Sequence, residues 1–161
     1  MIDVFYAPRE KVADTETALK TILSKYYGIE NAVISRNEHG KPFLETGEPF
    51  FSVSHTQELF FVAVAPFPVG LDAEPKNRKV EFLSICKKYP FFTPIPTATK
   101  EFLKAWTGFE SAVKYLGGSL ALDGKKLQKD DARFHFLEFE IKEHFLCVCT
   151  GEPSEVRWIG F

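Results

Sequence analysis

Two pairs of charged residues stand at spacings that would let their side chains act together. Asp72 and Glu74 are two residues apart in a stretch that reads as a strand, so both carboxylates leave the same face of it. Two converging carboxylates can bind a divalent cation such as magnesium, which takes oxygen ligands and usually bridges to a substrate phosphate. Glu110 and Lys114 are four residues apart in a helical pattern, which places a carboxylate and an ammonium group one turn apart.

Each pair also has an ordinary structural explanation. An Asp-x-Glu step at the end of a strand is commonly a solvated sheet edge. A glutamate and a lysine one helical turn apart can form a surface ion pair that contributes only about 0.3 to 0.5 kcal/mol. The chemical interpretation therefore depends on the neighbouring motifs, which occur in the order Gly40-Lys41-Pro42, Ser52-Val53-Ser54-His55, Val69-Gly70-Leu71-Asp72-Ala73-Glu74 and Trp106-Thr107-Gly108-Phe109-Glu110-Ser111-Ala112-Val113-Lys114, with Gly117 after them.

This ordered series resembles the motifs of the Sfp-type 4'-phosphopantetheinyl transferases. That family carries Gly-Lys-Pro, a Ser-His step, Gly-Ile/Val-Asp-x-Glu and Trp-x-x-Lys-Glu-Ala/Ser-x-x-Lys ahead of a glycine. The resemblance spans residues 37–120, about half of the chain, and its order and spacing argue against a chance match. It implies a shortened member of the superfamily with the 4'-phosphopantetheinyl transferase fold.

The resemblance implies a magnesium site in which Asp72, Glu74 and Glu110 hold the ion against the pyrophosphate of coenzyme A. Glu110 would also be the general base, directly or through water, for a carrier-protein serine that attacks the β-phosphate. Lys114 would stabilise the departing 3',5'-ADP by its positive charge. The implied activity is that of a holo-acyl-carrier-protein synthase, which transfers 4'-phosphopantetheine from coenzyme A to a serine of an acyl or peptidyl carrier protein.

The same resemblance implies the contacts to coenzyme A as a co-substrate. Ser54 and His55 would contact its phosphate groups, and His55 would thereby join Glu110 and Lys114 among the catalytic residues. Lys114 would also count among the residues that bind coenzyme A. The adenine end would lie against Gly40, Lys41 and Pro42.

Of the four histidines, only His55 lies in a motif that the resemblance connects with binding or catalysis. Taken by itself, His55 follows a strand and fits an ordinary turn histidine, and only the surrounding motifs favour a role in binding. The other three histidines lie outside the motifs that resemble the family or carry no matching role in them. No function is therefore assigned to His39, His135 or His144.

Two departures from the family pattern keep a second function open. Phe109 stands where the family usually has lysine, so one positive charge near the phosphates is missing. The segment after Phe91-Phe92 lacks the glutamate that usually follows, and the family uses this segment to dock carrier proteins. The alternative is a catalytically weakened protein of the same fold that binds coenzyme A or a carrier protein. An unrelated magnesium phosphohydrolase is a third interpretation, but it gives no reason for the Gly-Lys-Pro and Ser-His motifs.

The periodicity of apolar residues indicates the elements that must position these side chains. Residues 14–27 and 100–116 carry apolar stripes at helical spacing, and each stripe ends at a glycine, Gly28 or Gly117. Apolar runs bounded by glycine, proline and polar residues predict strands, of which the second and third form a hairpin. The predicted strands are residues 31–35, 50–54, 59–65, 69–73, 133–141, 145–150 and 156–159.

The order of these elements predicts an α+β fold, because a helix followed by strands occurs twice. We expect two pseudo-symmetric lobes, each a helix packed on a mostly antiparallel sheet. Residues 1–66 would form the N-terminal lobe, and residues 67–161 would form the C-terminal lobe with the metal and catalytic motifs. The resemblance also implies an Arg-containing helical region before the first helix, and this chain has no clear counterpart of it. Arg9, Lys11 or Arg36 would supply the phosphate contacts instead. A monomer with pseudo-twofold symmetry or a weak dimer is expected.

Composition and charge narrow the class of protein. The 161 residues are 45% hydrophobic and 26% charged, which is typical of a packed domain. A net charge of -2 argues against a broad nucleic-acid interface. The most apolar stretch, residues 60–71, contains two prolines and is too short to span a membrane, and residues 1–12 lack the apolar core of a signal peptide. We expect a cytoplasmic protein without nucleic-acid or membrane partners.

Overall fold

The first sheet has four strands and joins the two ends of the chain. In the computed structural model, which describes residues 1–161, the sheet order is β4 (Phe50–His55), β5 (Leu59–Ala65), β1 (Ile2–Pro8) and β9 (Val156–Gly160). Strand β1 runs antiparallel to β5 and parallel to β9, so the sheet is mixed. Every residue of β5 is buried, as its continuous apolar sequence requires of a strand covered on both faces.

Helix α1 (Thr15–Tyr27) covers one face of this sheet. The side chain of Asp14 accepts a hydrogen bond from the backbone N–H of Thr17 at 2.8 Å, which caps the start of the helix. Gly28 ends it at a φ of 66°, a left-handed conformation that glycine adopts without a steric penalty. The apolar stripe of the helix packs against the sheet through Leu19, Ile22 and Leu23.

The second sheet has three antiparallel strands and carries the acidic motif. Its order is β6 (Gly70–Pro75), β8 (His144–Thr150) and β7 (His135–Ile141). Helix α3 (Thr99–Leu116) packs on β6 and β8. The segment before α3 contains α2 (Leu83–Lys88) and a short 3-10 turn (Pro90–Phe92), and it closes an aromatic core with α3.

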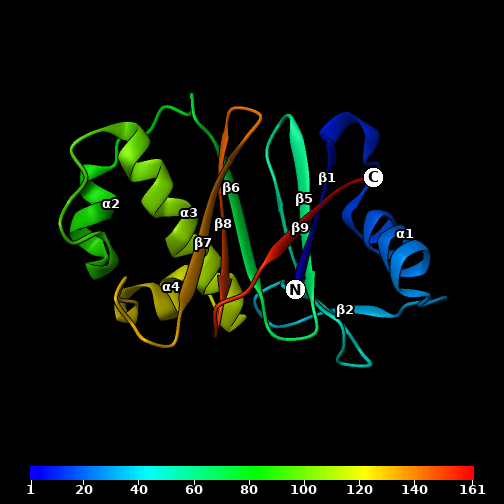
Figure 1. The fold of residues 1–161 in the computed structure, drawn as a ribbon. Helices are drawn as coiled ribbons and strands as arrows, with labels where there is room; N and C mark the ends of the chain where they lie inside the picture. Colours follow the sequence, from blue (N-terminus) through cyan, green and yellow to red (C-terminus); the bar gives the residue numbers. More distant parts are fainter.

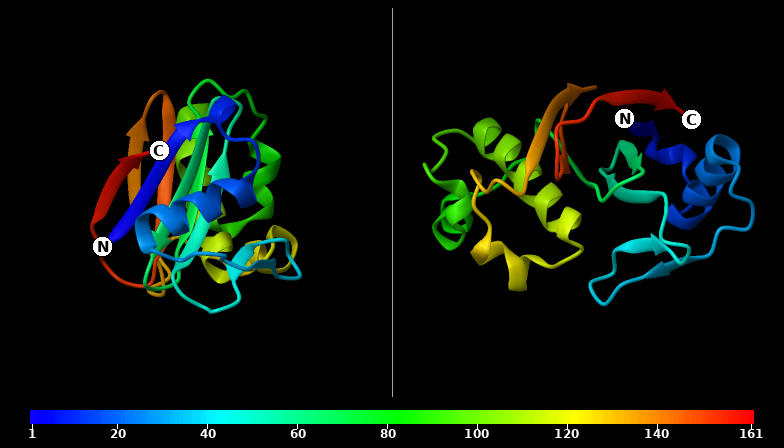
Figure 2. Two further views of the ribbon diagram at one scale, coloured as in Figure 1. Left: turned by 90° about the vertical axis from the view of Figure 1, so that its right-hand side faces the viewer. Right: turned by 60° about the horizontal axis from the view of Figure 1, so that its bottom comes forward.

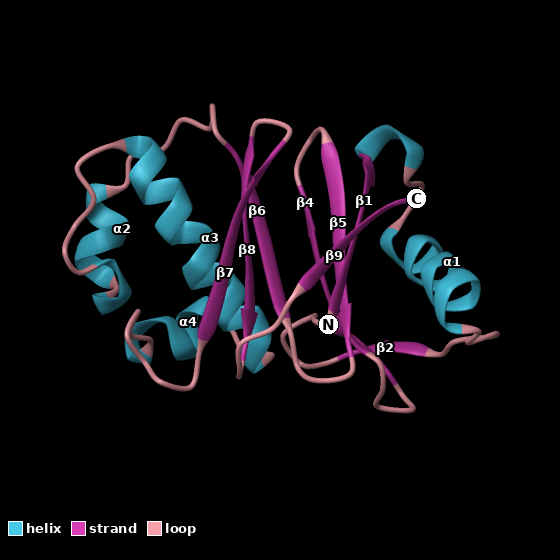
Figure 3. Ribbon diagram, in the orientation of Figure 1, coloured by secondary structure: helices cyan, strands magenta, loops and turns pink.

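The two sheets pack on each other, and the main helices lie outside them (Figures 1 and 3). The core between the sheets combines Val4 and Phe61 of the first sheet with Leu71 and Val148 of the second. The right-hand view of Figure 2 shows the same order, with α1 and α3 at opposite ends of the molecule. The chain is thus an α+β fold with one mixed and two antiparallel sheets.

Two small elements complete the fold next to the end of α3. The hairpin of β2 (Ile34–Arg36) and β3 (Pro42–Leu44) is a separate two-stranded sheet. Helix α4 (Leu120–Asp123) follows α3 after the glycines at 117 and 118. No helix in the chain is both long enough and apolar enough to cross a membrane.

Both predicted helices and six of the seven predicted strands are present with bounds shifted by at most two residues. The strand expected over residues 31–35 begins only at Ile34, because Asn31 adopts a φ of 55° that breaks an extended chain. Two strands, β1 and β3, and two α-helices, α2 and α4, were not predicted. The expected division into lobes of residues 1–66 and 67–161 stays a prediction. Strand β9 belongs to the second of these ranges by sequence, but it pairs with β1 of the first.

Candidate active site

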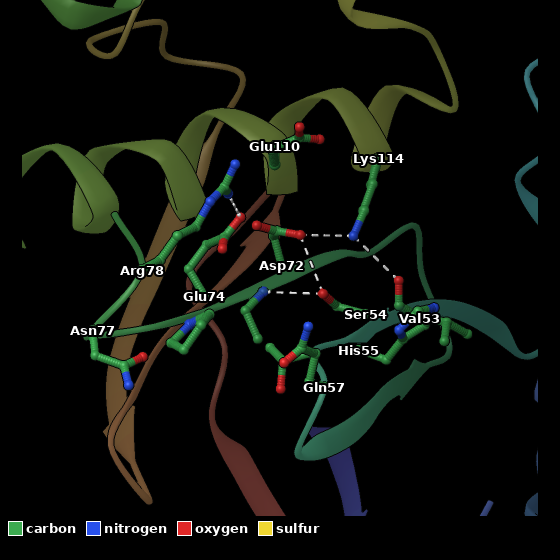
Figure 4. Close-up of a pocket in the computed structure, with 13 residues that line it drawn as sticks. Val53, Ser54, His55, Gln57, Asp72, Glu74, Asn77, Arg78, Glu110 and Lys114 are labelled. Atoms are coloured by element: carbon green, nitrogen blue, oxygen red, sulfur yellow. Dashed lines mark hydrogen bonds and ion pairs between the residues drawn. The ribbon is translucent and has the colours of Figure 1, made fainter. Parts of the chain in front are cut away.

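The predicted acidic and basic residues line one cavity of about 660 Å³ between β4, β6 and α3 (Figure 4). Asp72 and Glu74 alternate on β6, and Glu110 and Lys114 are one turn apart on α3. The cavity is predominantly polar, which suits a charged substrate better than an apolar one. Its full lining is Val53, Ser54, His55, Thr56, Gln57, Asp72, Ala73, Glu74, Pro75, Asn77, Arg78, Glu110 and Lys114.

A close approach of α3 to β6 brings the two pairs of residues together. Gly70 opens β6, and a Cβ atom placed on it would overlap the backbone oxygen of Ser111 and the backbone nitrogen of Tyr115. Only glycine allows two backbones to come this close. The glycine of the acidic motif therefore sets the distance between β6 and α3, the helix that carries Glu110 and Lys114.

Asp72 is buried and makes polar contacts through only one of its carboxylate oxygens. Its Oδ1 atom accepts hydrogen bonds from Lys114 Nζ at 2.8 Å and from the Ser54 hydroxyl at 3.2 Å. Lys114 Nζ also donates to the carbonyl of Val53 at 3.2 Å. The Oδ2 atom of Asp72 is buried without any hydrogen-bond partner. Because a buried carboxylate oxygen is costly to leave unpaired, this atom is open to a cation.

Glu74 pairs with a residue that sequence analysis did not single out. Arg78 donates from its Nη1 atom to Glu74 Oε1 across the turn that follows β6. Burial, and then the carboxylate of Asp72, raise the pKa of Glu74, while Arg78 opposes this shift. Arg78 lies four residues after Glu74, a spacing that would indicate an ion pair in a helix. The two residues are not joined by a helix, so the sequence did not predict their contact.

Glu110 is the carboxyl group with the largest shift toward the neutral form. Burial, and then the charge of Asp72, raise its pKa to about 7, with a smaller contribution from Glu74. Lys114 and Arg78 act in the opposite direction without cancelling the effect. Figure 4 shows no hydrogen bond or ion pair from Glu110 to the other residues of the cavity. A carboxylate of this pKa can accept a proton near neutral pH.

The three carboxylates suit a magnesium ion by their chemistry but do not form a finished site. Oxygen donors in small number are what magnesium takes when it also binds substrate phosphates, and Asp72 Oδ2 offers one buried donor. The pKa values of Glu74 and Glu110 are raised first by burial and then by the charge of Asp72, so a cation bound beside these carboxylates would favour their ionised forms. However, no three His, Cys, Asp or Glu side chains are grouped closely enough to hold a metal ion as they stand. The fit therefore depends on donor chemistry and on the unpaired oxygen.

The Ser54 hydroxyl forms its hydrogen bonds with other groups of the protein, whereas the sequence predicted a contact with a phosphate group. Ser54 is buried, and its hydroxyl accepts a hydrogen bond from the backbone N–H of Ala73 at 3.1 Å while it donates to Asp72. Ser52, two residues earlier on β4, accepts a hydrogen bond from the backbone N–H of Leu71 at 3.0 Å. These two serines join β4 to β6, which are not paired through their backbones. The serines thereby hold Asp72 in place.

A second cavity of about 350 Å³ adjoins the first and shares Val53, His55 and Lys114 with it. His55 ends β4 and is exposed, so it can reach either cavity. The Gly-Lys-Pro motif also lines this second cavity, and its contact with the adenine end of coenzyme A stays a prediction. The remaining lining is Thr15, Arg36, His39, Gly40, Lys41, Pro42, Ser52, Gly117 and Gly118.

Lys41 directs its ammonium group into the protein. It donates hydrogen bonds to the carbonyl of Val69 at 3.3 Å and to the carbonyl of Lys114. Burial, and then the charge of Lys114, lower the pKa of Lys41 to about 8. Asn37 completes this contact, since its amide donates to the carbonyl of Gly117 at 2.8 Å while its Oδ1 atom accepts from the backbone N–H of Lys41. The β2-β3 turn thus caps the end of α3.

Phe109, the departure from the family pattern, faces away from the cavity. It is fully buried and lies in contact with the rings of Tyr89, Phe91, Phe92 and Trp106, at centroid distances of 4.9 to 5.5 Å. A lysine in this position would have to place its charge in an aromatic core or turn out of it. The phenylalanine is explained by packing.

Comparison with known proteins gives one informative similarity. No protein-family model matches the chain. A protein from Aneurinibacillus migulanus described as "4'-phosphopantetheinyl transferase gsp" is 29% identical to the chain over 98 residues. The alignment covers 55% of this chain and 39% of that relative. The chain therefore matches well under two thirds of the relative's length.

Proposed function

This similarity supports membership of the chain in the 4'-phosphopantetheinyl transferase superfamily, and from that premise we propose that it moves the 4'-phosphopantetheine arm of coenzyme A onto a serine of an acyl or peptidyl carrier protein. The observation that carries the proposal is the shared cavity of Asp72, Glu74, Glu110 and Lys114. Such a transfer needs a proton acceptor, a cation at the leaving group and oxygen donors for a metal ion. The cavity offers all three kinds of group.

Asp72, Glu74 and Glu110 are the proposed holders of magnesium. A bound magnesium ion supplies charge that neutralises phosphate oxygens. Asp72 Oδ2 is the best supported of the donors, because it is buried and has no partner in the protein. Ser54 and Lys114 fix the other oxygen of the same carboxylate, which keeps Oδ2 directed away from them.

Glu110 is the proposed general base. Its pKa of about 7 is close to the value at which a group can both accept and release a proton under neutral conditions. In the proposed step the serine hydroxyl gives its proton to Glu110 while the serine oxygen forms a bond to the β-phosphorus. The bond between that phosphorus and the bridging oxygen breaks, and 3',5'-ADP leaves with the electron pair. Lys114 would stabilise the charge that develops on the leaving group.

Coenzyme A would extend across both cavities. His55 borders the two, so it is the proposed contact for the pyrophosphate. The backbone of Gly40 and Lys41 and the ring of Pro42 would enclose the adenine end. The charge of Lys41 would act on the protein instead of the ligand. This assignment goes with the proposed arrangement of two pseudo-symmetric lobes, residues 1–66 and 67–161, around one site in a monomer.

A second candidate is a weakened member of the same fold that binds coenzyme A or a carrier protein without efficient transfer. Two observations favour it. Lys114 and Arg78 already pair with Asp72 and Glu74, so both carboxylates are partly compensated without a metal ion. The helix also lacks the second lysine of the family pattern, since Phe109 occupies that position in the core.

One experiment separates these functions. The chain is incubated with coenzyme A, magnesium and an apo carrier protein, and the carrier is then measured by mass spectrometry. A gain on the order of 340 Da, the mass of one phosphopantetheine group, supports transfer. Coenzyme A binding without this gain supports the second candidate. If coenzyme A neither binds nor reacts, or is hydrolysed without modification of the carrier, the transferase proposal is wrong.

A further inference from the structure

His144 is a buried histidine that the proposed chemistry does not use. It begins β8, only 1% of its surface is exposed, and its ring lies edge-on to Phe61 at a centroid distance of 6.3 Å. Both of its ring nitrogens have partners. Nδ1 lies 2.6 Å from the carbonyl oxygen of Lys142, and Nε2 lies 3.0 Å from the hydroxyl of Thr56. The ring therefore joins the β7-β8 turn to the β4-β5 turn, which belong to different sheets.

The direction of these hydrogen bonds follows from their partners. A carbonyl oxygen can only accept, so Nδ1 carries the proton that is shared with Lys142. In a neutral ring Nε2 then accepts, and the hydroxyl of Thr56 donates to it. The same hydroxyl oxygen accepts from the backbone N–H groups of Glu58 at 3.2 Å and Leu59 at 3.1 Å. A continuous series of hydrogen bonds thus runs from Lys142 to the backbone of the β4-β5 turn.

The β4-β5 turn forms part of the wall of the candidate active site. Thr56 lies between His55 and Gln57, and all three residues line the larger cavity. His55 also lines the smaller one. Thr56 is the residue of the turn whose side chain faces back into the protein to meet His144. A loss of that contact would free the turn and, with it, the backbone that carries His55.

The other end of the series is a strained turn. Lys142 and Glu143 have φ values of 44° and 59°, in the left-handed region that hairpin turns usually fill with asparagine and glycine. Such strain persists only where the surroundings hold it. The carbonyl of Lys142 is held by His144, and that of Glu143 accepts from the backbone N–H of Lys76 at 2.9 Å. Lys76 directly follows Pro75, which lines the larger cavity and pairs with His144 in the sheet.

We infer that His144 is a positioning residue for His55. Through the hydroxyl of Thr56 it fixes the β4-β5 turn so that His55 is held at the border of the two cavities, ready for the pyrophosphate of coenzyme A. That the ligand is coenzyme A rests on the proposed function. In this role His144 neither contacts coenzyme A nor takes part in proton transfer.

Variants of the two partners test this role through coenzyme A binding. His144→Phe removes both ring nitrogens, and Thr56→Val removes the hydroxyl while keeping the shape of the side chain. Each is expected to raise the Kd for coenzyme A with magnesium, measured by calorimetry, about tenfold. The double variant is expected to bind no worse than either single one, because both break the same series. Thr56→Ser, which keeps the hydroxyl, is expected to restore most of the affinity.

Thr150→Val is the matched control at the opposite end of β8. It removes a buried hydroxyl that donates to the carbonyl of Glu152 at 2.7 Å, far from the turn. This variant is expected to lose stability and to leave the Kd for coenzyme A unchanged. Amide hydrogen exchange adds a second measurement. The N–H groups of Glu58 and Leu59 are expected to exchange at least tenfold faster in Thr56→Val and at the wild-type rate in Thr150→Val.

The outcomes separate the two proposals. If the wild-type chain binds coenzyme A and Thr56→Val binds it equally well, the inference about His144 is overturned and the proposed function stands. Full additivity of the two single variants would likewise overturn it. If the wild-type chain binds no coenzyme A, the proposed function fails and the role of His144 fails with it. Thr56→Val keeps the test decisive if His144→Phe does not fold.

Discussion

The ammonium group of Lys41 donates a hydrogen bond to the backbone carbonyl of Lys114 in the last turn of α3. The same group reaches the carbonyl of Val69, just before β6. A positive charge at the C-terminal end of a helix is favourable, because the last carbonyls have no partners within the helix. Lys41 therefore links the two elements that carry Asp72 and Lys114, in addition to lining the cavity proposed for the adenine end.

Lys41→Met tests this link, because methionine keeps an apolar stem of similar length and removes the charge. We expect a loss of roughly 1 to 3 kcal/mol in the free energy of unfolding, the usual contribution of hydrogen bonds from a charged group. We also expect kcat to fall together with a rise in KM for coenzyme A, because Lys114 shifts relative to Asp72. Urea unfolding and transfer kinetics measure the two effects.

Lys129→Met is the control for Lys41→Met, since Lys129 is exposed and lines neither cavity. It is expected to match the wild-type chain in stability and in transfer. A Lys41→Met chain that keeps its stability and its kcat and changes only KM would show that Lys41 acts on the ligand alone.

Gly70→Ala tests the close approach of α3 to β6. The added methyl group would overlap backbone atoms of Ser111 and Tyr115, which cannot move without moving the helix. We expect a loss of at least about 2 kcal/mol in stability, comparable with overpacking in a core, and a large loss of transfer. Thermal unfolding and the carrier-protein assay measure both.

Gly108→Ala is the matched control for Gly70→Ala, because it also adds one methyl group at the contact between α3 and its surroundings. That methyl group would meet only side-chain atoms, the nearest being Cζ of Phe91 at 3.6 Å, which is an ordinary contact. It should leave stability equal or slightly higher, since alanine favours a helix more than glycine does. Equal behaviour of the two variants would rule out a special role for Gly70.

The parts of the site that the sequence predicted are those that depend on local spacing. Strand alternation placed Asp72 and Glu74 on one face, and helical spacing placed Glu110 and Lys114 on one turn. The motif order then indicated that the two pairs meet, and the structure brings them into one cavity. Strand β1 was missed because its sequence shows neither a clean alternation nor an uninterrupted apolar run like that of β5, since Asp3 divides it.

The parts that the sequence could not predict depend on partners distant in the chain. Ser54 and Lys41 each belong to a motif, but their side chains bind backbone groups of β6 and α3 that no local pattern brings near. His144 is buried because the two sheets pack on each other. In the sequence it belongs to a short polar segment between two predicted strands, a setting that predicts an exposed side chain. Residues of this kind become visible only when the register of the strands is known.

Glu110→Gln tests the general base. The amide keeps the size of the side chain but cannot accept the serine proton, so transfer is expected to fall by a factor on the order of 100 to 10,000. The Kd for coenzyme A without magnesium is expected to change little, because Glu110 lies at the α3 side of the larger cavity and does not line the smaller one. Transfer at the wild-type rate in this variant would remove Glu110 from the mechanism.

The pH dependence of stability gives an independent test of the environment of Glu110. Burial and the neighbouring carboxylate of Asp72 raise its pKa from 4.5 to about 7 in the folded chain. Between these values the folded chain keeps a proton that the unfolded chain has released, so the free energy of unfolding falls as the pH rises. A shift of this size corresponds to roughly 3 kcal/mol at most. Glu110→Gln is expected to lack this loss, so its stability relative to the wild-type chain rises from pH 4 to pH 8.

Urea unfolding at a series of pH values with a chelator present measures this difference. Glu155→Gln serves as the control, because Glu155 is exposed and lies outside both cavities, and it is expected to follow the wild-type curve. Magnesium with coenzyme A should reduce the loss at pH 8, since binding to the folded chain alone stabilises it. Parallel curves for Glu110→Gln and the wild-type chain would show that Glu110 has an ordinary pKa. Glu110 would then be ionised well below neutral pH and would be a poor acceptor for the serine proton.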